Sequence, residues 1–277
     1  MTDAEIIQKN LCAANDDRRR ADAIEAGQIA EFVQRLRMKA SADISPEEAF
    51  ARYNEVFSDR PLLSQFYAQF ILQLQISGML DIRLFGSDVF PVSERRIYYS
   101  KSPYTDAALV KFSSLLSAPV LCAETDLQAI CEAVSSEEHS YGVLPISDSV
   151  DGELPAFVRM IHAYQLKICA VCDIPTSDGE KELRLALLSD RLHCAPGSTF
   201  LDVSFTPESD RALVDALASL AYLDAEICRI NARPLEYNRN RFLYNITVSA
   251  APNAFAGLAA FTRTAMNASL DGVYPLL

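Results

Sequence analysis

The sequence predicts a protein of mixed α/β and α+β class, with a helical bundle first, a single α/β lobe next and a ferredoxin-like βαββαβ domain last. Three observations predict this order. Apolar residues recur at helical spacing up to about residue 83, strand-like and helical segments then alternate, and residues 198–277 follow the order strand, helix, strand, strand, helix, strand.

The helical part covers residues 1–83. Between Asp22 and Met38, apolar side chains recur at close to helical spacing, which is typical of an amphipathic helix. Ser45 followed by Pro46 is typical of a helix start, because a serine hydroxyl caps the first turn and proline suits the first helical position. A third, strongly apolar helix is predicted from Pro61 through Leu80.

Residues 84–95 break this periodicity with a glycine and a proline, and they are predicted to link the bundle to the lobe. In the lobe, residues 96–190, the alternation of strands and helices favours a layer of mainly parallel strands. The strands are expected near 96–100, 119–122, 141–146, 166–173 and 183–189, and the helices near 104–116, 125–135 and 153–163.

Pro196 and Gly197 separate the lobe from the last domain, residues 198–277. Its strands are expected near 199–205, 225–232, 240–250 and 271–275, and its helices near 208–222 and 253–267. This βαββαβ order is the ferredoxin-like arrangement.

Composition excludes several classes of protein. The net charge is −12 and no segment is basic, so we expect no nucleic acid as a partner. The chain shows no charged and then apolar leader and no apolar run of the length that spans a membrane, so we expect neither secretion nor membrane insertion and a cytoplasmic location.

Cysteines and histidines indicate neither a metal site nor a cofactor. Seven cysteines, an odd number, are typical of a reducing compartment, and we expect no disulfides. Cys169 and Cys172 lie in an apolar strand-like run, where residues three apart point to opposite faces, so a structural role is expected. The three histidines show no metal-ligand spacing.

The most informative stretch is residues 141–152, an apolar strand that leads into a polar loop able to hold an anion. It resembles the Val-Pro-Ile-Glu-Asn-Ser…Gly signature of the prephenate dehydratase family, with Ser147 and Asp148 in place of Glu-Asn and with these residues in register: Val143, Leu144, Pro145, Ile146, Ser149 and Gly152. Residues 102–108 and 166–170 also resemble segments of that family. The resemblance covers residues 96–277.

Three later segments resemble the ACT regulatory domain that is fused to dehydratases. Arg211–Val214 resembles Gly-Ala-Leu-Val, Asn231–Pro234 resembles Glu-Ser-Arg-Pro, and Gly272–Pro275 resembles Gly-Cys-Tyr-Pro. The order of helical, dehydratase-like and ACT-like parts resembles fused chorismate mutase/prephenate dehydratase proteins. On that resemblance, residues 1–83 are interpreted as mutase-derived.

The resemblance implies a reaction and residues for it. Prephenate dehydration expels a hydroxyl group and carbon dioxide, so an enzyme needs a proton donor for the leaving oxygen and cations for the carboxylates. The family's Thr-Arg-Phe motif corresponds to residues 183–185, which keep the arginine and lose the hydroxyl. The residues implied as catalytic are Arg184, Thr105 and Ser149, and those implied as substrate-binding are Tyr104, Ser147 and Asp148.

Family members also carry a second lobe where this chain has only residues 174–182. Without that wall, a substrate near Arg184 would stay hydrated, and electrostatic help would fall with the higher local dielectric. We therefore expect a truncated dehydratase with weak or no activity. The alternative is an active prephenate dehydratase whose wall is rebuilt by the amino-terminal bundle or a partner subunit.

The resemblance further implies a role in phenylalanine biosynthesis and allosteric regulation by an aromatic amino acid, bound between paired ACT domains of a homodimer or larger assembly. The alternative is an ACT domain that only dimerises. The residues implied as effector-binding are Arg211, Ala212, Leu213, Val214, Asn231, Ala232, Arg233 and Pro234.

Other interpretations stay open. Arg184 could pair with Asp148 or Asp151 at a strand edge, and the loop at residues 147–149 could satisfy its own backbone groups. A third kind of function is a scaffold, in which the apolar helix of residues 66–80 binds another enzyme of the pathway.

Overall fold

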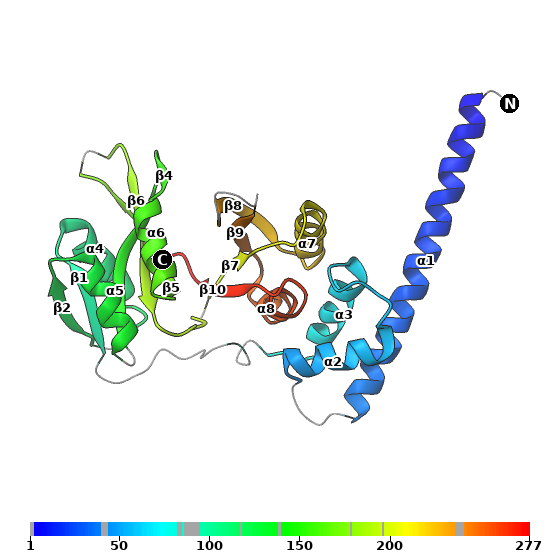
Figure 1. The fold of residues 1–277 in the computed structure, drawn as a ribbon, viewed down its shortest axis with the longest axis horizontal. Helices are drawn as coiled ribbons and strands as arrows, with labels where there is room; N and C mark the ends of the chain where they lie inside the picture. The colour runs from blue at the N-terminus through cyan, green and yellow to red at the C-terminus, as the bar shows by residue number, and fades with distance from the viewer. Residues whose placement is uncertain are drawn as a thin grey trace.

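The computed structural model describes residues 3–39, 44–81, 85, 95–116, 118–137, 140–177, 179–195, 197–235 and 241–277. Its elements form three neighbouring parts: an α/β lobe, a ferredoxin-like domain and a group of amino-terminal helices (Figure 1). The predicted fold class is confirmed, since a mixed ten-stranded sheet is combined with helices. Among the described helices, none combines the length and apolar character needed to cross a membrane.

The amino-terminal part consists of α1 (Asp3–Lys39), α2 (Pro46–Phe57) and α3 (Gln65–Ile76). The predicted start of α2 is confirmed, because the Ser45 hydroxyl accepts a hydrogen bond from Glu48 N at 3.1 Å. The third helix begins later than predicted, at Gln65 and not at Pro61. The reason is a second serine cap, Ser64, whose hydroxyl accepts from the amide of the third helical residue.

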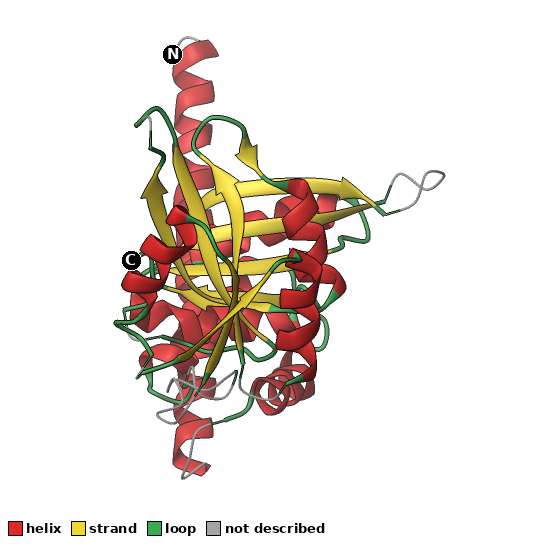
Figure 2. Ribbon diagram, turned by 90° about the vertical axis from the view of Figure 1, so that its left-hand side faces the viewer, coloured by secondary structure: helices red, strands yellow, loops and turns green. Residues whose placement is uncertain are grey.

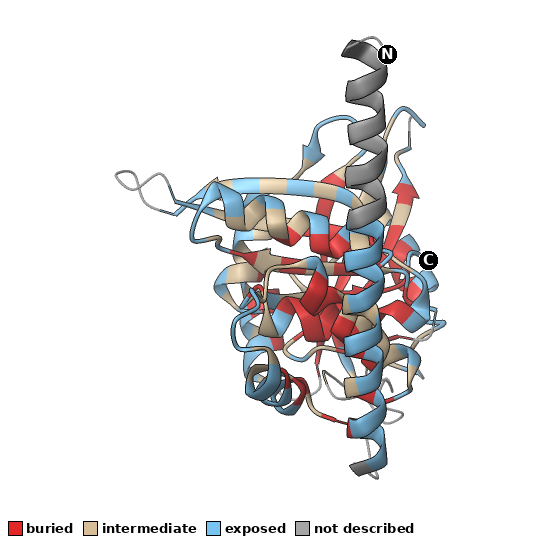
Figure 3. Ribbon diagram, turned by 90° about the vertical axis from the view of Figure 1, so that its right-hand side faces the viewer, coloured by how far each residue is buried: buried red, intermediate tan, exposed pale blue. Residues whose placement is uncertain are grey.

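From residue 18 to residue 38, α1 is mostly exposed. In this part of the helix the buried side chains form one stripe, Ile29, Val33 and Leu36, and the rest of the side seen in Figure 3 is mostly accessible to solvent. α3, by contrast, buries Phe66, Tyr67, Ala68, Phe70, Ile71 and Leu74 within this chain. The proposed scaffold role of this helix therefore loses its structural basis, because its apolar face is already covered.

The bundle packs on the helices of the ferredoxin-like domain. The hydroxyls of Tyr67 and Thr264 are hydrogen-bonded at 2.8 Å, and Gly257 N donates to Gln75 Oε1 at 2.8 Å. The bundle lies on the side of that domain away from the lobe (Figure 1). It therefore does not supply a wall beside Arg184, and this part of the rebuilt-cleft alternative is wrong.

The lobe contains α4 (Pro103–Phe112), α5 (Leu127–Ser136), α6 (Pro155–Ala163) and six strands: β1 (Arg96–Ser100), β2 (Val120–Glu124), β3 (Tyr141–Asp148), β4 (Gly152–Glu153), β5 (Lys167–Pro175) and β6 (Glu182–Ser189). β1 pairs in parallel with β2 and β3. β6 lies antiparallel between β3 and β5. The prediction of mainly parallel strands thus holds for only one half of the lobe.

The connection between β5 and β6 explains this difference. Thr176 N donates to Lys181 O at 2.8 Å, so the chain reverses within residues 176–181. A parallel crossover needs a dozen or more residues, whereas a link this short can only form a hairpin. β6 must therefore run antiparallel to β5.

The two faces of the lobe sheet carry different helices. Residues of α4 pack with Ile97, Tyr99, Leu185 and Leu187, and residues of α5 and α6 pack with Tyr98. Cys169 and Cys172 are both buried in the α4 cluster. The expectation that they face opposite sides is wrong. A β-bulge between residues 168 and 170 adds one residue to the strand, so the usual alternation of faces does not hold there.

The ferredoxin-like domain consists of β7 (Phe200–Phe205), α7 (Asp210–Tyr222), β8 (Glu226–Pro234), β9 (Phe242–Ser249), α8 (Phe255–Thr264) and β10 (Ser269–Tyr274), with a short 3-10 turn, η2 (Pro252–Ala254), before α8. Its strand order is β10-β7-β9-β8, and these pairs are antiparallel.

One strand joins the two sheets. β10 pairs in parallel with β5 at Gly272 and Ile168, so the strands of both parts belong to one hydrogen-bonded sheet, in which the two groups of strands run in different directions (Figure 2). A Cβ at Gly272 would lie 2.8 Å from Ile168 O. A glycine is therefore required here, because only its bare backbone allows β10 to approach β5 this closely.

Candidate functional site

The ferredoxin-like sheet has one apolar and one polar face. Residues such as Val203, Ile246 and Val248 pack with α7 and α8. Because successive strand residues point to opposite faces, their neighbours point toward the lobe. This lobe-facing set is polar: Asp202, Ser204, Arg229, Asn231, Arg233, Asn245 and Thr247.

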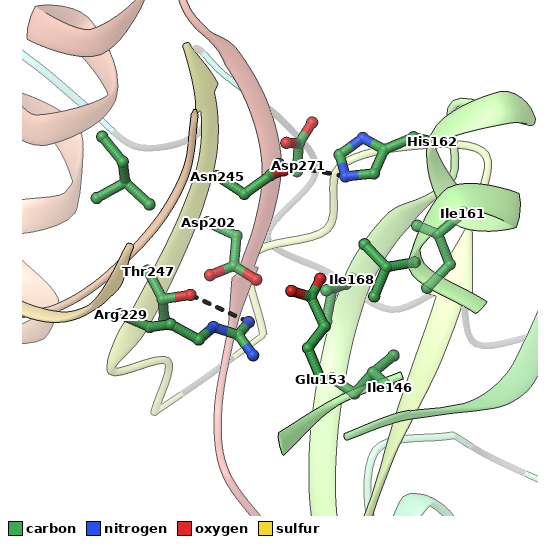
Figure 4. Close-up of a pocket in the computed structure, with 12 residues that line it drawn as sticks. Ile146, Glu153, Ile161, His162, Ile168, Asp202, Arg229, Asn245, Thr247 and Asp271 are labelled. Atoms are coloured by element: carbon green, nitrogen blue, oxygen red, sulfur yellow. Dashed lines mark hydrogen bonds between the residues drawn. The ribbon is translucent and has the colours of Figure 1, made fainter. Parts of the chain in front are cut away.

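The lobe meets this polar face with side chains from β4, α6 and β5. Asn231 Nδ2 donates to the Glu153 carboxylate, and Asn245 Nδ2 lies 3.2 Å from His162 Nε2. We call the space between these two surfaces the interdomain cleft (Figure 4). Its two walls come from different parts of the chain, and the hydrogen bonds across it fix their spacing.

The cleft contains two adjoining hollows. The first, of about 40 Å³, is lined by residues of Figure 4 that include Asp202, Arg229 and Thr247, and it has room for about two or three water molecules. The second, of about 180 Å³, is lined by Ile146, Val171, Arg184, Phe200, Cys228, Arg229, Thr247, Tyr274 and Leu276. Ile146, Arg229 and Thr247 line both hollows, so the two hollows are neighbours in the cleft.

Asp202 is the acid of the cleft. Its Oδ2 accepts a hydrogen bond from the Tyr274 hydroxyl at 3.0 Å, whereas its buried Oδ1 has no hydrogen-bond partner among the described residues. Burial raises the pKa of Asp202, against the opposing effects of Thr247, Arg229 and Tyr274. The ring of Tyr274 stacks on Phe200 at a centroid distance of 5.8 Å, which fixes the direction of its hydroxyl.

Arg229 is the cationic side chain of the first hollow. It lies opposite Thr247 in the β8–β9 register and donates to Thr247 Oγ1 at 3.3 Å. Within the described part of the chain, no carboxylate forms an ion pair with this guanidinium. Much of its hydrogen-bonding capacity therefore remains available for a ligand.

His162 closes the other end of the first hollow. Burial lowers the pKa of His162, although the nearby Asp271 carboxylate acts in the opposite direction. Asp271 in turn lies 3.5 Å from Lys167 Nζ and accepts a hydrogen bond from Ser204. Among the described residues, no group of three or more His, Cys, Asp and Glu side chains is arranged to hold a metal ion.

The structure uses Thr105 to start α4. Thr105 Oγ1 accepts from Ser102 N at 3.0 Å and donates to Ser100 O at 2.7 Å, in a capping box that leaves the side chain buried. Tyr104 is half-buried against the α4 cluster. Both residues therefore belong to the α4 face of the lobe sheet.

Ser149 and Asp148 hold the end of β3. Ser149 Oγ accepts from Glu182 N at 2.9 Å, and Asp148 Oδ1 accepts from Val150 N at 2.8 Å and from Asp151 N at 2.5 Å. The hydrogen bonds from these two amides, Asp151 first, lower the pKa of Asp148. This geometry supports the alternative that the loop satisfies its own backbone groups. Ser147 is buried in β3, opposite Arg184 in the β3–β6 register.

Arg184 forms a bidentate ion pair within the lobe. Its Nε and Nη2 donate to the two carboxylate oxygens of Asp173 at 2.7 and 2.8 Å. The alternative partners, Asp148 and Asp151, are wrong, because the β5–β6 register places Asp173 directly opposite. The Arg184 side chain lines the interdomain cleft on the α5 and α6 face, whereas Thr105 and Tyr104 lie on the α4 face. The residues predicted from the resemblance therefore do not lie together in one site.

No protein-family model matches this sequence, and a search of curated proteins gives no match. Solved structures do match. The X-ray structure of prephenate dehydratase from Streptococcus mutans is similar with a TM-score of 0.53 and 18% identity, over 66% of this chain and 98% of that chain. The chain has a prephenate dehydratase-like fold.

Two further structures are similar over about the same share of this chain. GqqA, described as a novel type of quorum quenching acylase, matches with a TM-score of 0.50 and 18% identity, over 65% of this chain and 94% of that chain. Prephenate dehydratase from Arthrobacter aurescens in complex with L-Phe matches with a TM-score of 0.46 and 15% identity, over 65% and 89%. The prephenate dehydratase-like fold alone does not decide the activity, so function must be argued from the residues of this chain.

The segments predicted to bind an effector lie on both faces of the ferredoxin-like sheet. Arg211 is 84% exposed on α7 and paired with Asp215 at 2.9 Å, and Val214 is also exposed. Leu213 and Ala212 are half-buried beside them, and Ala232 and Pro234 are exposed. Asn231 and Arg233 instead face the lobe, where Arg233 donates to Asn245 Oδ1 at 2.6 Å.

Sequence reasoning missed Arg229, Asp202, Glu153 and His162 as members of a site. One signal for Arg229 was present: in β8, Arg229, Asn231 and Arg233 are polar at every second position, which indicates a strand with one polar face. The other three residues come from separate elements, so no local pattern could group them.

Proposed function

We propose that this protein is a prephenate dehydratase-like protein of phenylalanine biosynthesis whose dehydratase activity is weak or absent and which responds to an aromatic amino acid. The weak or absent dehydratase activity is inferred from the bidentate ion pair of Arg184 with Asp173. A guanidinium already bound by a carboxylate has little capacity left for a substrate carboxylate.

The hydroxyls support the same proposal. Dehydration needs a proton donor beside the leaving oxygen. The Thr105 hydroxyl donates its proton to Ser100 O, and breaking this hydrogen bond would cost about 1 kcal/mol. Ser149 is exposed and already accepts from Glu182 N, so its position is set by the backbone rather than by a substrate.

The shape of the lobe adds a second line of support. The chain reverses between Thr176 and Lys181, close to Arg184 in the sequence, and the hollow that Arg184 lines is also lined by Arg229, Thr247 and Tyr274 of the ferredoxin-like sheet. The side chain that remains of the family's motif therefore faces the regulatory-like domain. This arrangement favours coupling between the two domains over catalysis between two lobes.

Thermal unfolding of the full chain tests the amino-acid response. Phenylalanine, tyrosine, prephenate and chorismate are titrated separately, because a ligand that binds only the native state stabilises it by about 2.7 kcal/mol at one hundred times its Kd. The proposal expects a rise of the unfolding temperature with an aromatic amino acid. No rise with phenylalanine or tyrosine would contradict it.

We also propose that two copies pair through the ferredoxin-like domain. β8 ends the ten-stranded sheet, and Ile230 on this edge strand is 42% exposed. Unpaired strand edges are templates for association. Sedimentation analysis checks this: a dimer is expected, and Ile230→Lys should shift it toward monomer, whereas Val110→Lys on α4 should not. A wild-type monomer at all concentrations would contradict the pairing.

A further inference from the structure

The interdomain cleft holds a cation that forms no ion pair among the described residues, although its charge acts on the nearby Asp202 carboxylate. Arg229 is half-buried, makes a single hydrogen bond of 3.3 Å to Thr247 and has no ion pair among the described residues. The other arginine of the cleft, Arg184, is neutralised by Asp173. Removing a guanidinium from water without a full set of partners is unfavourable, so Arg229 is suited to bind a carboxylate.

The same space holds an acceptor without a donor. Asp202 Oδ1 is buried and unpartnered, while the other oxygen is held by the Tyr274 hydroxyl. Figure 4 shows Asp202, Arg229 and Thr247 directed into the space between the ferredoxin-like sheet and the lobe. An ammonium group is the natural donor for such an oxygen, because it supplies both a proton and a compensating charge.

Beside these groups lies an apolar chamber. The hollow of about 180 Å³ is walled by Ile146, Val171, Phe200, Tyr274 and Leu276 and opens onto Arg229. An apolar cavity of about 150 Å³ accepts a benzene molecule. The chamber therefore has the size and lining for the apolar side chain of a small ligand.

We propose that the interdomain cleft binds an α-amino acid with an apolar side chain, with its carboxylate on Arg229, its ammonium on Asp202 Oδ1 and its side chain against Phe200, Val171 and Leu276. The inference rests on the proposed amino-acid response and gives it a location. The ligand lies between the lobe and the ferredoxin-like sheet, rather than between two copies at the start of α7.

This location couples ligand binding to the relation between the two domains. The lobe contributes Ile146 and Val171, and the ferredoxin-like domain contributes Arg229 and Asp202. A ligand that contacts both parts stabilises the arrangement in which they are close. Binding is therefore expected to protect β4 and α6, which face the cleft, as well as β8 from amide hydrogen exchange.

Isothermal titration calorimetry of the full chain tests the proposal with three probes: L-phenylalanine, 3-phenylpropionate, which lacks the ammonium, and phenethylamine, which lacks the carboxylate. We expect only phenylalanine to bind tightly. Arg229→Gln should weaken phenylalanine binding at least tenfold, because a charged hydrogen bond is lost. Asp202→Asn should weaken phenylalanine binding and leave 3-phenylpropionate unchanged.

Two further variants keep the test decisive if a buried change disturbs folding. Leu276 is 44% exposed at the mouth of the chamber, so Leu276→Trp should fill it and abolish binding without burying a new charge. Arg211→Gln, on exposed α7, changes the effector site that the family resemblance implies, and it should bind like the wild type if the ligand lies in the cleft.

The outcomes separate this inference from the proposed function. If wild type binds phenylalanine, Arg211→Gln loses binding, and Arg229→Gln and Leu276→Trp retain it, the location is overturned while the amino-acid response stands. If wild type binds none of the probes and no aromatic amino acid raises its unfolding temperature, both are overturned.

Discussion

At the scale of single residues, the burial of Asp202 and His162 in the interdomain cleft makes the free energy of unfolding depend on pH. Asp202 has a raised pKa because it is buried, and its folded-state pKa therefore exceeds the ordinary value of 3.8. A carboxyl with a raised pKa favours the folded state when it is protonated. Its contribution is complete below pH 3.8 and is lost as the pH rises through the raised value.

The first prediction follows for Asp202→Asn. At pH 7 the variant should be more stable than wild type by about 1–3 kcal/mol, because it removes a buried, partly unpaired charge. The gain should shrink as the pH falls toward 3.8. Urea unfolding at both pH values checks this, and an equal gain at both would contradict the assigned cause.

The second prediction concerns His162, whose contribution to stability is lost as the pH falls and not as it rises. Burial lowers the pKa of His162 and of His193 below 6.5. Each contributes stability that is present above pH 6.5 and is lost as the pH falls through its lowered pKa, by at most about 1.4 kcal/mol per pH unit. His162→Gln should flatten this loss in part and His162→Gln/His193→Gln further. An unchanged pH profile in both variants would contradict it.

Single residues also show how much of the candidate site could be predicted from the sequence. The family resemblance implied Arg184, Thr105 and Ser149 as catalytic, but it could not predict the hydrogen bonds and the ion pair that these side chains already form. Asp173 is opposite Arg184 only because β6 is antiparallel, and Asp202 and Arg229 line the same hollow only because β7, β9 and β8 pair side by side. Such relations depend on register, which single residues do not encode.

At the scale of elements, the contact between α3 and α8 depends on one glycine. Gly257 N is in the first turn of α8, where amides have no partner within the helix, and Gln75 Oε1 accepts its hydrogen bond. A Cβ at Gly257 would lie 2.1 Å from this oxygen. Gln75 of α3 can therefore cap the start of α8 only if residue 257 is glycine.

The third prediction is a double-mutant cycle on this contact. Gly257→Ala and Gln75→Ala should each lower the free energy of unfolding by about 1–3 kcal/mol, since each leaves a buried amide without its acceptor. The double variant should lose less than the sum, because both changes remove the same bond. Gly27→Ala, on exposed α1 with no atom within 4 Å, should instead be neutral or stabilising. Strict additivity would contradict the shared contact.

Elements were predicted well where the signal is local and less well where it is not. Ser45 marks the start of α2, and the βαββαβ order of residues 198–277 is present in the periodicity alone. The direction of β6 was missed, because it depends on the length of the turn before it. The bulge in β5 was missed as well, since one extra residue changes the face of a strand without changing its composition.

At the scale of the whole molecule, Gly272 joins two domains into one sheet. The fourth prediction is that Gly272→Ala separates them, because the added Cβ would lie 2.8 Å from the backbone oxygen of Ile168 and β10 would have to move away. Calorimetry should show wild type unfolding in fewer steps than the variant. Gly27→Ala serves as the control, and an unaltered transition in Gly272→Ala would contradict the role of this pairing.

The arrangement of the three parts sets what the molecule can do. The helices pack behind the ferredoxin-like domain, and the polar face of that domain forms one wall of the cleft beside the lobe. None of this placement could be predicted from periodicity, because it depends on which surfaces remain uncovered after each part folds. It leaves Arg184 in a hollow that it shares with residues of the ferredoxin-like sheet.

The most direct test of this account is the formation of phenylpyruvate from prephenate by the purified full chain at neutral pH, measured against a blank without protein and against Arg184→Ala. The account predicts a rate close to the blank and equal in both proteins, because Arg184 is bound by Asp173. A clear wild-type rate that disappears in Arg184→Ala and persists in Arg211→Ala would contradict it.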